Sequence, residues 1–286
     1  VNAGVDTGYA KQATISGDDK HFGWRLGRFF LTGFTRVTAD ENQQPVFIKT
    51  LGDSVTLWFD LEQDIDALNG NAQLSLAADA NGYDQQFGIP KTNFGRGTLI
   101  VRHTDYQNAK NEPAVYTDYL LAKGTTGANT RIVLHEEGDY EVALDYEVQD
   151  SELTHITSKF GNYRIFLRFS IRNGNCMVYP FDLLTGAELQ NTAVAEAGFS
   201  LDLARSRYLD INVRRAVLVE TANGVIEDER FNRPAKDGDR YTQEGIYTIS
   251  VSNRYTGEST TKTIFVGSQE LLETYVRNGF SLERLK

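Results

Sequence analysis

The stretch EEGDYEVALDY at residues 136–146 decides the fold, because the chain repeats its pattern about a hundred residues later. The second copy, QEGIYTISVSN, occupies residues 243–253. Both read acidic residue, Gly, any residue, Tyr, and then apolar residues at every second position. Apolar residues that alternate in this way are typical of a half-buried β-strand. The repeat therefore predicts one structural device that the chain uses twice.

Each copy is interpreted as a tight corner that leads into a strand of the core. Gly138 and Gly245 would supply the backbone conformation of the corner, since glycine has no Cβ atom. Tyr140 and Tyr247 would place their rings under the corner and donate a hydrogen bond to the backbone upstream, as in the tyrosine corner of immunoglobulin-like sandwiches. The last strand of each domain would then pair with the strand that follows the corner.

The same alternation continues from residue 29 onward and predicts further strands. They are expected at residues 54–62, 73–79, 97–104, 130–136, 139–148, 163–172, 176–184, 197–204, 208–220, 245–253 and 259–267. Residues 226–241 are highly charged and are expected to form a loop.

Strands 139–148 and 163–172 are expected to pair antiparallel. One carries outward carboxylates, and the other carries Arg164, Arg168 and Arg172 on its outer face, so opposite charges would meet across the pair. A solvated, ion-paired face is the favoured interpretation of this arginine row, and an anion site is the alternative.

The end of the chain has a helical pattern. Ser268 is a candidate N-cap, the apolar residues of 271–276 share one face, and Gly279 stands where a helix would stop. The helix would pack on the preceding domain or begin a linker. The sequence as a whole predicts an all-β fold of two tandem immunoglobulin-like β-sandwich domains with a short C-terminal helix. The predicted parts are an N-terminal arm at 1–28, an enlarged sandwich at 29–174, a second sandwich at 175–267, and a helical tail or linker at 268–286.

The second half resembles the bacterial immunoglobulin-like modules found in surface proteins of Gram-positive and gut bacteria. The resemblance rests on residues 245–267, which read Gly-x-Tyr-x-apolar-x-apolar, a short polar turn, and a Thr-rich strand. It covers about 176–267, and more loosely 29–174, where insertions at 80–96 and 105–129 would account for a length beyond the usual ~100 residues. Apolar residues such as Val142 and Ile249 fill the positions of the core cysteines. The resemblance implies a non-enzymatic, exported surface module and brings no catalytic residues with it.

Composition excludes several classes of partner. The net charge of -10 argues against nucleic acid. No apolar run approaches the roughly 18 residues of a membrane helix, so no direct membrane insertion is expected. Cys176 is the only cysteine and is expected to be a reduced thiol in a turn between the domains. The chain begins at Val1, which favours removal of a leader, and we expect an extracellular or cell-surface monomer within a longer chain.

Motifs for metal or cofactor binding are weak, and neither is expected. The four histidines have no helical ligand spacing. DANGYD at 79–84 partly matches a calcium loop through Asp79, Asn81 and Asp84, but Pro90 stands where the bidentate Glu belongs. An Asn-Gly turn is the favoured interpretation.

The functional candidates are few. Trp58 lies on the face opposite the apolar residues of its strand and, with Trp24, could stack on a ligand; alternatively the N-terminal arm covers it. The carboxylates Glu227, Asp228 and Glu229 could serve a glycosidase, although a solvated loop is favoured for them. The leading hypothesis is adhesion or structural spacing, with protein or glycan partners at the cell surface. The alternatives are a carbohydrate-binding accessory module and, more weakly, a hydrolase.

Overall fold

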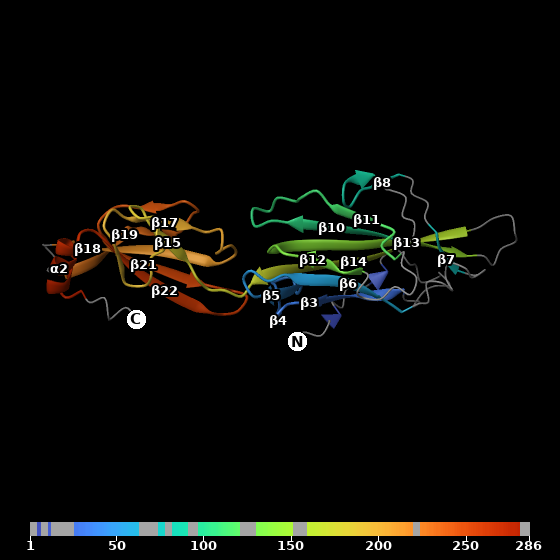
Figure 1. Cartoon of the computed structure of the whole chain (residues 1–286), viewed down its shortest axis with the longest axis horizontal. Helices are drawn as coiled ribbons and strands as arrows, with labels where there is room; N and C mark the ends of the chain where they lie inside the picture. Colours follow the sequence, from blue (N-terminus) through green and yellow to red (C-terminus); the bar gives the residue numbers. More distant parts are fainter. Residues whose placement is uncertain are drawn as a thin grey trace. The chain divides into compact units, whose positions relative to one another are not determined.

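The computed structural model describes residues 5–6, 11–12, 26–62, 74–77, 82–90, 97–120, 130–150, 159–219 and 224–280 of the chain. These residues form β-strands and a short helix, which confirms the all-β class (Figure 1). The chain divides into two compact units, Val1–Asn173 (unit 1) and Gly174–Lys286 (unit 2). No helix in the described residues is long and apolar enough to cross a membrane.

Unit 1 contains two main sheets. Its strands are β1 (Val5–Asp6), β2 (Lys11–Gln12), β3 (Gly27–Thr32), β4 (Arg36–Ala39), β5 (Pro45–Lys49), β6 (Val55–Leu61), β7 (Leu74–Ala77), β8 (Tyr83–Asp84), β9 (Ile89–Pro90), β10 (Thr98–Thr104), β11 (Ala114–Thr117), β12 (Ile132–Leu134), β13 (Gly138–Asp150) and β14 (Lys159–Asn173). One sheet runs β1-β3-β6-β12, and the main path of the larger sheet runs β11-β10-β13-β14-β5-β4. Outside this path, β2 pairs with β14 and β7 pairs with β13, while β8 and β9 form a separate hairpin.

The alternating residues of these strands build one core between the two sheets. Leu57 and Phe59 from β6 lie in the same buried cluster as Val142 from β13 and Phe169 from β14. Removing such side chains from water is the main favourable term in folding. The two sheets of unit 1 are therefore layers packed on a shared apolar interior.

Unit 2 repeats the layered design on a smaller scale. Its elements are β15 (Tyr179–Asp182), β16 (Ala193–Ala195), β17 (Phe199–Asp202), β18 (Asp210–Val219), β19 (Gly224–Pro234), β20 (Arg240–Tyr241), β21 (Gly245–Ser252), β22 (Ser259–Val266) and the helix α2 (Gln269–Arg277). The sheet β16-β22-β21-β18-β19 shares a core with the sheet β15-β17-β20, through residues such as Ile249 and Phe199.

The repeated motif occupies the same place in both units. Four neighbouring strands run β10-β13-β14-β5 in unit 1 and β18-β21-β22-β16 in unit 2. In each unit the strand after the Gly-x-Tyr corner, β13 or β21, pairs antiparallel with the last strand. The last strand then takes a parallel neighbour, β5 or β16, from earlier in the unit. The chain repeats its sequence pattern because it repeats this strand plan.

The loop predicted at 226–241 is wrong over most of its length. Residues Gly224–Pro234 form strand β19, which pairs with β18 at the edge of the sheet. Charged side chains are disfavoured in central strands but suit an edge, where they discourage pairing with another chain. Composition alone therefore pointed to a loop where the fold places an edge strand.

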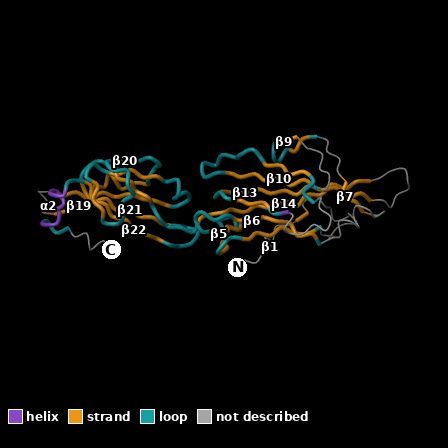
Figure 2. Tube along the Cα trace, viewed as in Figure 1, coloured by secondary structure: helices purple, strands orange, loops and turns teal. Residues whose placement is uncertain are grey.

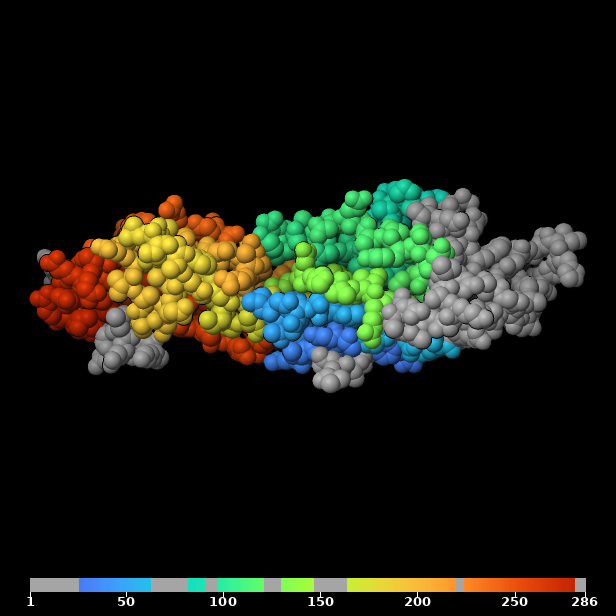
Figure 3. Space-filling model, viewed as in Figure 1, coloured from blue at the N-terminus to red at the C-terminus, as the bar shows by residue number. Residues whose placement is uncertain are grey.

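Helix α2 packs on unit 2 (Figure 2). Ser268 is its N-cap, as predicted, and its hydroxyl accepts a hydrogen bond from the backbone N–H of Leu271 at 3.1 Å. Leu272 and Tyr275 are buried in a cluster with Phe265 of β22. The opposite side of the helix lies at the molecular surface, shown in red in Figure 3.

Candidate functional site

The two corner tyrosines make the same backbone contact. The hydroxyl of Tyr140 donates a hydrogen bond to the carbonyl of Glu136 at 2.7 Å, and that of Tyr247 donates to the carbonyl of Gln243 at 2.8 Å. Burial raises the pKa of Tyr247 to about 12, so its hydroxyl keeps the proton that it donates. Both rings are buried in the core clusters of their units. The buried rings and their hydrogen bonds hold the two corners in place.

The two corner positions require glycine because neighbouring atoms leave no room for a Cβ atom. Gly138 has φ +151°, and a Cβ there would lie 2.1 Å from Nε2 of His103 and 2.4 Å from the carbonyl oxygen of Thr104. Gly245 has φ +142°, and its Cβ would lie 2.6 Å from the carbonyl oxygen of Ala216. No other residue fits either position without a shift of the neighbouring strand.

The arginine row of β14 forms the pairs that the sequence predicted. Asp145 lies directly across from Arg164, and Glu141 lies directly across from Arg168. Nη2 of Arg164 donates to Oδ2 of Asp145 at 2.6 Å and also contacts Asp84. Arg172 pairs with Asp139 at 2.8 Å. The guanidinium groups are thus neutralised within the sheet.

The expected solvation of this face is wrong for most of the row. The side chains of Arg164 and Arg172 are only 14% and 7% exposed. The segment that joins β8 to β9 covers part of the face, with the ring of Phe87 under the guanidinium groups of Arg102 and Arg164 at 5.1 Å and 5.5 Å. Such cation–π contacts are attractive, so they help to hold the β8–β9 segment against the arginine row.

The carboxylate of Asp84 stabilises the turn of the hairpin β8–β9. Its Oδ1 accepts hydrogen bonds from the N–H groups of Gln86 and Phe87 at 2.9 Å and 3.1 Å. Burial alone would raise the pKa of Asp84, but these bonds and the contact with Arg164 outweigh it and hold the pKa below its ordinary value. Asp79 and Asn81 of the candidate calcium loop lie outside the described residues. Within the described part of the chain, no three His, Cys, Asp or Glu residues gather as metal ligands would.

The carboxylates considered for a hydrolase, Glu227, Asp228 and Glu229, lie on the edge strand β19, which pairs with β18. Asp228 of β19 accepts from Arg215 of β18 at 2.9 Å and from Arg230 at 2.8 Å. These hydrogen bonds, above all that from Arg230, lower the pKa of Asp228 to about 2. A general acid at a glycosidic bond needs a raised pKa, so this environment does not suit that role. Glu227 and Glu229 are exposed.

Cys176 lies in the segment between β14 and β15 as a free thiol, as the sequence predicted, and it is buried there. It is 4% exposed within the core cluster of unit 2, and its Sγ lies 3.3 Å from the carbonyl oxygen of Glu258. The thiol packs as a small apolar group, which glycine and asparagine neighbours in the sequence did not indicate.

Trp58 is half-buried on the outer face of its sheet. The ring of Phe30, its direct cross-strand partner, stacks beside it with centroids 5.6 Å apart, and the guanidinium carbon of Arg131 lies 5.6 Å from its ring. Trp24 falls outside the described residues. The predicted cover by the N-terminal arm therefore stays a prediction, while Phe30 and Arg131 already occupy part of the surroundings of the indole.

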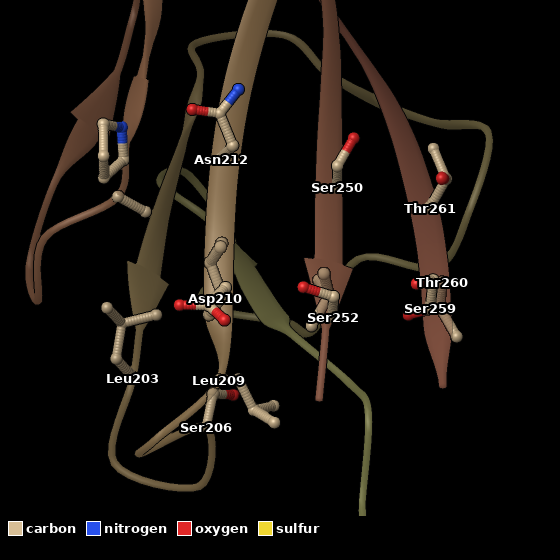
Figure 4. A pocket seen from close by; sticks show the side chains of 14 residues that line it. Leu203, Ser206, Leu209, Asp210, Asn212, Ser250, Ser252, Ser259, Thr260 and Thr261 are labelled. Carbon is tan, nitrogen blue, oxygen red and sulfur yellow. The ribbon is translucent and has the colours of Figure 1, made fainter. Parts of the chain in front are cut away.

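The described surface of unit 2 contains a pocket, which we call the hydroxyl pocket. It has a volume of about 550 Å³ and is lined by residues of β18, β21 and β22, by the segment at 203–209, and by Pro234 and Ala235. Figure 4 shows two polar rows that cross three neighbouring strands. One row contains Asn212, Ser250 and Thr261, and the other contains Asp210, Ser252 and Ser259.

The lining of the hydroxyl pocket combines hydroxyl and amide groups with apolar side chains and is nearly neutral. Asp210 is paired with Arg254 at 2.8 Å, and the amide of Asn212 donates to Asn232 at 2.7 Å. Serine and threonine hydroxyls both donate and accept hydrogen bonds, so this surface suits neutral polar groups. The sequence contained the pattern, since Ser and Thr alternate with Ile and Val in 248–252. Alternation of this kind predicts only a strand, because hydroxyls on the outer face of a strand need no ligand.

The chain matches no protein-family model, and no curated protein matches it.

Proposed function

We propose that the chain is a non-enzymatic module of an exported bacterial surface protein, built from immunoglobulin-like sandwiches and acting in adhesion or as a structural spacer. The observation that carries the adhesive role is the hydroxyl pocket, a concave surface of about 550 Å³ whose nearly neutral lining combines hydroxyl groups with apolar side chains. Pockets of this size are typical of ligand sites, and this one offers hydrogen bonds without a net charge. The shared strand plan of the two units supports the immunoglobulin-like assignment.

The carbohydrate-binding reading is the second candidate, and the same pocket favours it. Sugar hydroxyls are both donors and acceptors, as are the serine and threonine side chains that line the pocket. The pocket lining contains no aromatic ring for stacking on a sugar. Adhesion to a polar protein surface therefore ranks first.

The test places a bulky charge in the pocket. Thr261 is exposed on β22, so Thr261→Arg should leave the fold intact while it fills the pocket and adds an unmatched charge. Gln190→Arg is the matched control, because Gln190 is exposed outside the pocket. Wild type and both variants would be labelled and applied to an array of neutral glycans and to a panel of purified extracellular host proteins.

Each result has a distinct meaning. Protein binding that Thr261→Arg abolishes and Gln190→Arg preserves supports adhesion through the pocket. Glycan binding with the same dependence supports the accessory-module function instead. Binding that survives Thr261→Arg contradicts the pocket as the contact surface, and absence of binding on both panels leaves the spacer role alone.

A further inference from the structure

A lysine at the end of β5 is buried against an asparagine at the end of β14. Lys49 is 3% exposed and Asn173 is 7% exposed. The two residues are direct partners in the parallel pairing of these strands. Nζ of Lys49 donates a hydrogen bond to Oδ1 of Asn173 at 2.6 Å. The amide carbon Cγ lies one C=O bond, about 1.2 Å, beyond that oxygen, so the amine is held close to an electrophilic carbon.

A carboxyl group completes the cluster. Oε1 of Glu137 accepts a hydrogen bond from Nδ2 of Asn173 at 2.6 Å, and Oε2 accepts one from the backbone N–H of Asn173 at 2.9 Å. Glu137 directly precedes the corner glycine of unit 1, so the motif that fixes the fold also places this carboxyl group. The side-chain amide of Asn173 is therefore held between an amine and a carboxyl group.

The surroundings favour the uncharged forms of both flanking groups. Burial lowers the pKa of Lys49, against the opposing charges of Glu137 and Asp53. Burial also raises the pKa of Glu137, against the hydrogen bonds from Asn173 and the charges of Arg172 and Lys49. A neutral amine is a nucleophile, and a carboxylic acid can donate a proton, so both shifts favour the same chemistry.

We propose that Lys49 and Asn173 condense to form an intramolecular isopeptide bond, with Glu137 transferring the protons, so that β5 becomes covalently joined to β14. The Nζ lone pair attacks Cγ of Asn173, and a new C–N bond forms. The Cγ–Nδ2 bond breaks, and Nδ2 leaves as ammonia. Glu137 accepts a proton from the attacking nitrogen and supplies one to the leaving nitrogen, and it ends the reaction unchanged. No oxidant, metal or other reactant is required.

Unit 2 provides an internal comparison. Gly138 pairs with Ile171 as Gly245 pairs with Val266, and the parallel pairs are Ile171 with Phe47 and Val266 with Ala195. By this register the positions of Glu137, Lys49 and Asn173 correspond to Glu244, Ala197 and Ser268. Unit 2 keeps the acidic residue but has neither the amine nor the amide. The bond is therefore specific to unit 1.

Intact mass spectrometry of the denatured chain tests the proposal directly. Loss of ammonia makes the cross-linked chain about 17 Da lighter than its sequence. A tandem spectrum of the tryptic digest should contain one branched peptide that joins the segment around Lys49 to the segment around Asn173. A wild-type mass equal to that of the sequence would overturn the proposal.

Three variants separate the bond from other routes to the same mass. Asn173 precedes Gly174, and a succinimide at that Asn-Gly step would also release ammonia. Lys49→Arg should restore the full mass, whereas a succinimide would persist in that variant and contradict the cross-link. Glu137→Gln should retain both reacting residues yet stay uncross-linked, and full cross-linking in it would remove Glu137 from the mechanism. Glu136→Gln is the matched control, because that carboxylate is 76% exposed, and it should cross-link like wild type.

Discussion

Tyr140 and Tyr247 show how single side chains determine the architecture of this chain. Each combines a buried aromatic ring with a hydroxyl that donates to a carbonyl four residues upstream. The hydrogen bond fixes the backbone of the corner, and the buried ring fixes the same tyrosine in the core. The corner residues are therefore the positions where small substitutions have a clear expected cost.

Removing one hydroxyl tests this contact. Tyr140→Phe and Tyr247→Phe keep the ring and delete the hydrogen bond, so each should destabilise its unit by about 1 kcal/mol. Urea unfolding followed by fluorescence measures the difference. Tyr116→Phe is the control, since Tyr116 is 40% exposed, and it should change the free energy of unfolding very little. Equal effects of Tyr116→Phe and Tyr140→Phe would contradict the role given to the corner.

A single added methyl group tests the backbone of the corner. Gly138→Ala forces a Cβ into the carbonyl oxygen of Thr104 and an unfavourable φ, so it should cost at least ~2 kcal/mol. Gly224→Ala is the matched change, because it has no positive φ and open space around the new Cβ, and its cost should be near zero. Thermal unfolding of the two variants supplies the comparison.

At the scale of elements, the hairpin β8–β9 is held on unit 1 by charge. Asp84→Asn weakens the contact with Arg164 and should cost about 1–3 kcal/mol at pH 7. Since the folded-state pKa of Asp84 is lowered, its contribution is complete above the unfolded value of about 3.9 and is lost as pH falls through the folded value. Wild type and variant should therefore converge in acid. Glu112→Gln, at an exposed carboxylate, is the control and should change the free energy of unfolding very little.

Helix α2 depends on its cap and on one aromatic side chain. Ser268→Ala removes the acceptor for the N–H of Leu271 and should destabilise unit 2 by about 1 kcal/mol. Tyr275→Ala empties a buried site against Phe265 and should cost about 3–5 kcal/mol. Val276→Ala is the control on the exposed face, because Val276 is 50% exposed. Circular dichroism during urea unfolding ranks the three, and an effect of Val276→Ala as large as that of Tyr275→Ala would contradict the packing.

Elements with a strict period of two could be predicted from sequence, and those set by tertiary contacts could not. Strands β13 and β14, their antiparallel pairing and their charge pairs all follow from alternation. Strand β19 was missed because an edge position tolerates charges that a central strand excludes. The hydroxyl pocket was missed because its residues come from strands whose adjacency depends on the fold. The Lys49–Asn173 pair is 124 residues apart, and no local pattern joins them.

At the scale of the whole molecule, the chain is one strand plan built twice with different additions. Unit 1 adds a covered charged face and the hydrogen-bonded cluster of Lys49, Glu137 and Asn173. Unit 2 adds helix α2 and the hydroxyl pocket. The corner motif is common to both, which predicts that each copy stabilises its own unit.

Hydrogen–deuterium exchange of Gly138→Ala and Gly245→Ala tests that central claim most directly. Gly138→Ala should raise exchange in β10, β13 and β14 and leave β18, β21 and β22 as protected as in wild type. Gly245→Ala should give the reverse pattern. Loss of protection across both units in either variant would show that the two copies hold a single core, and would contradict the account.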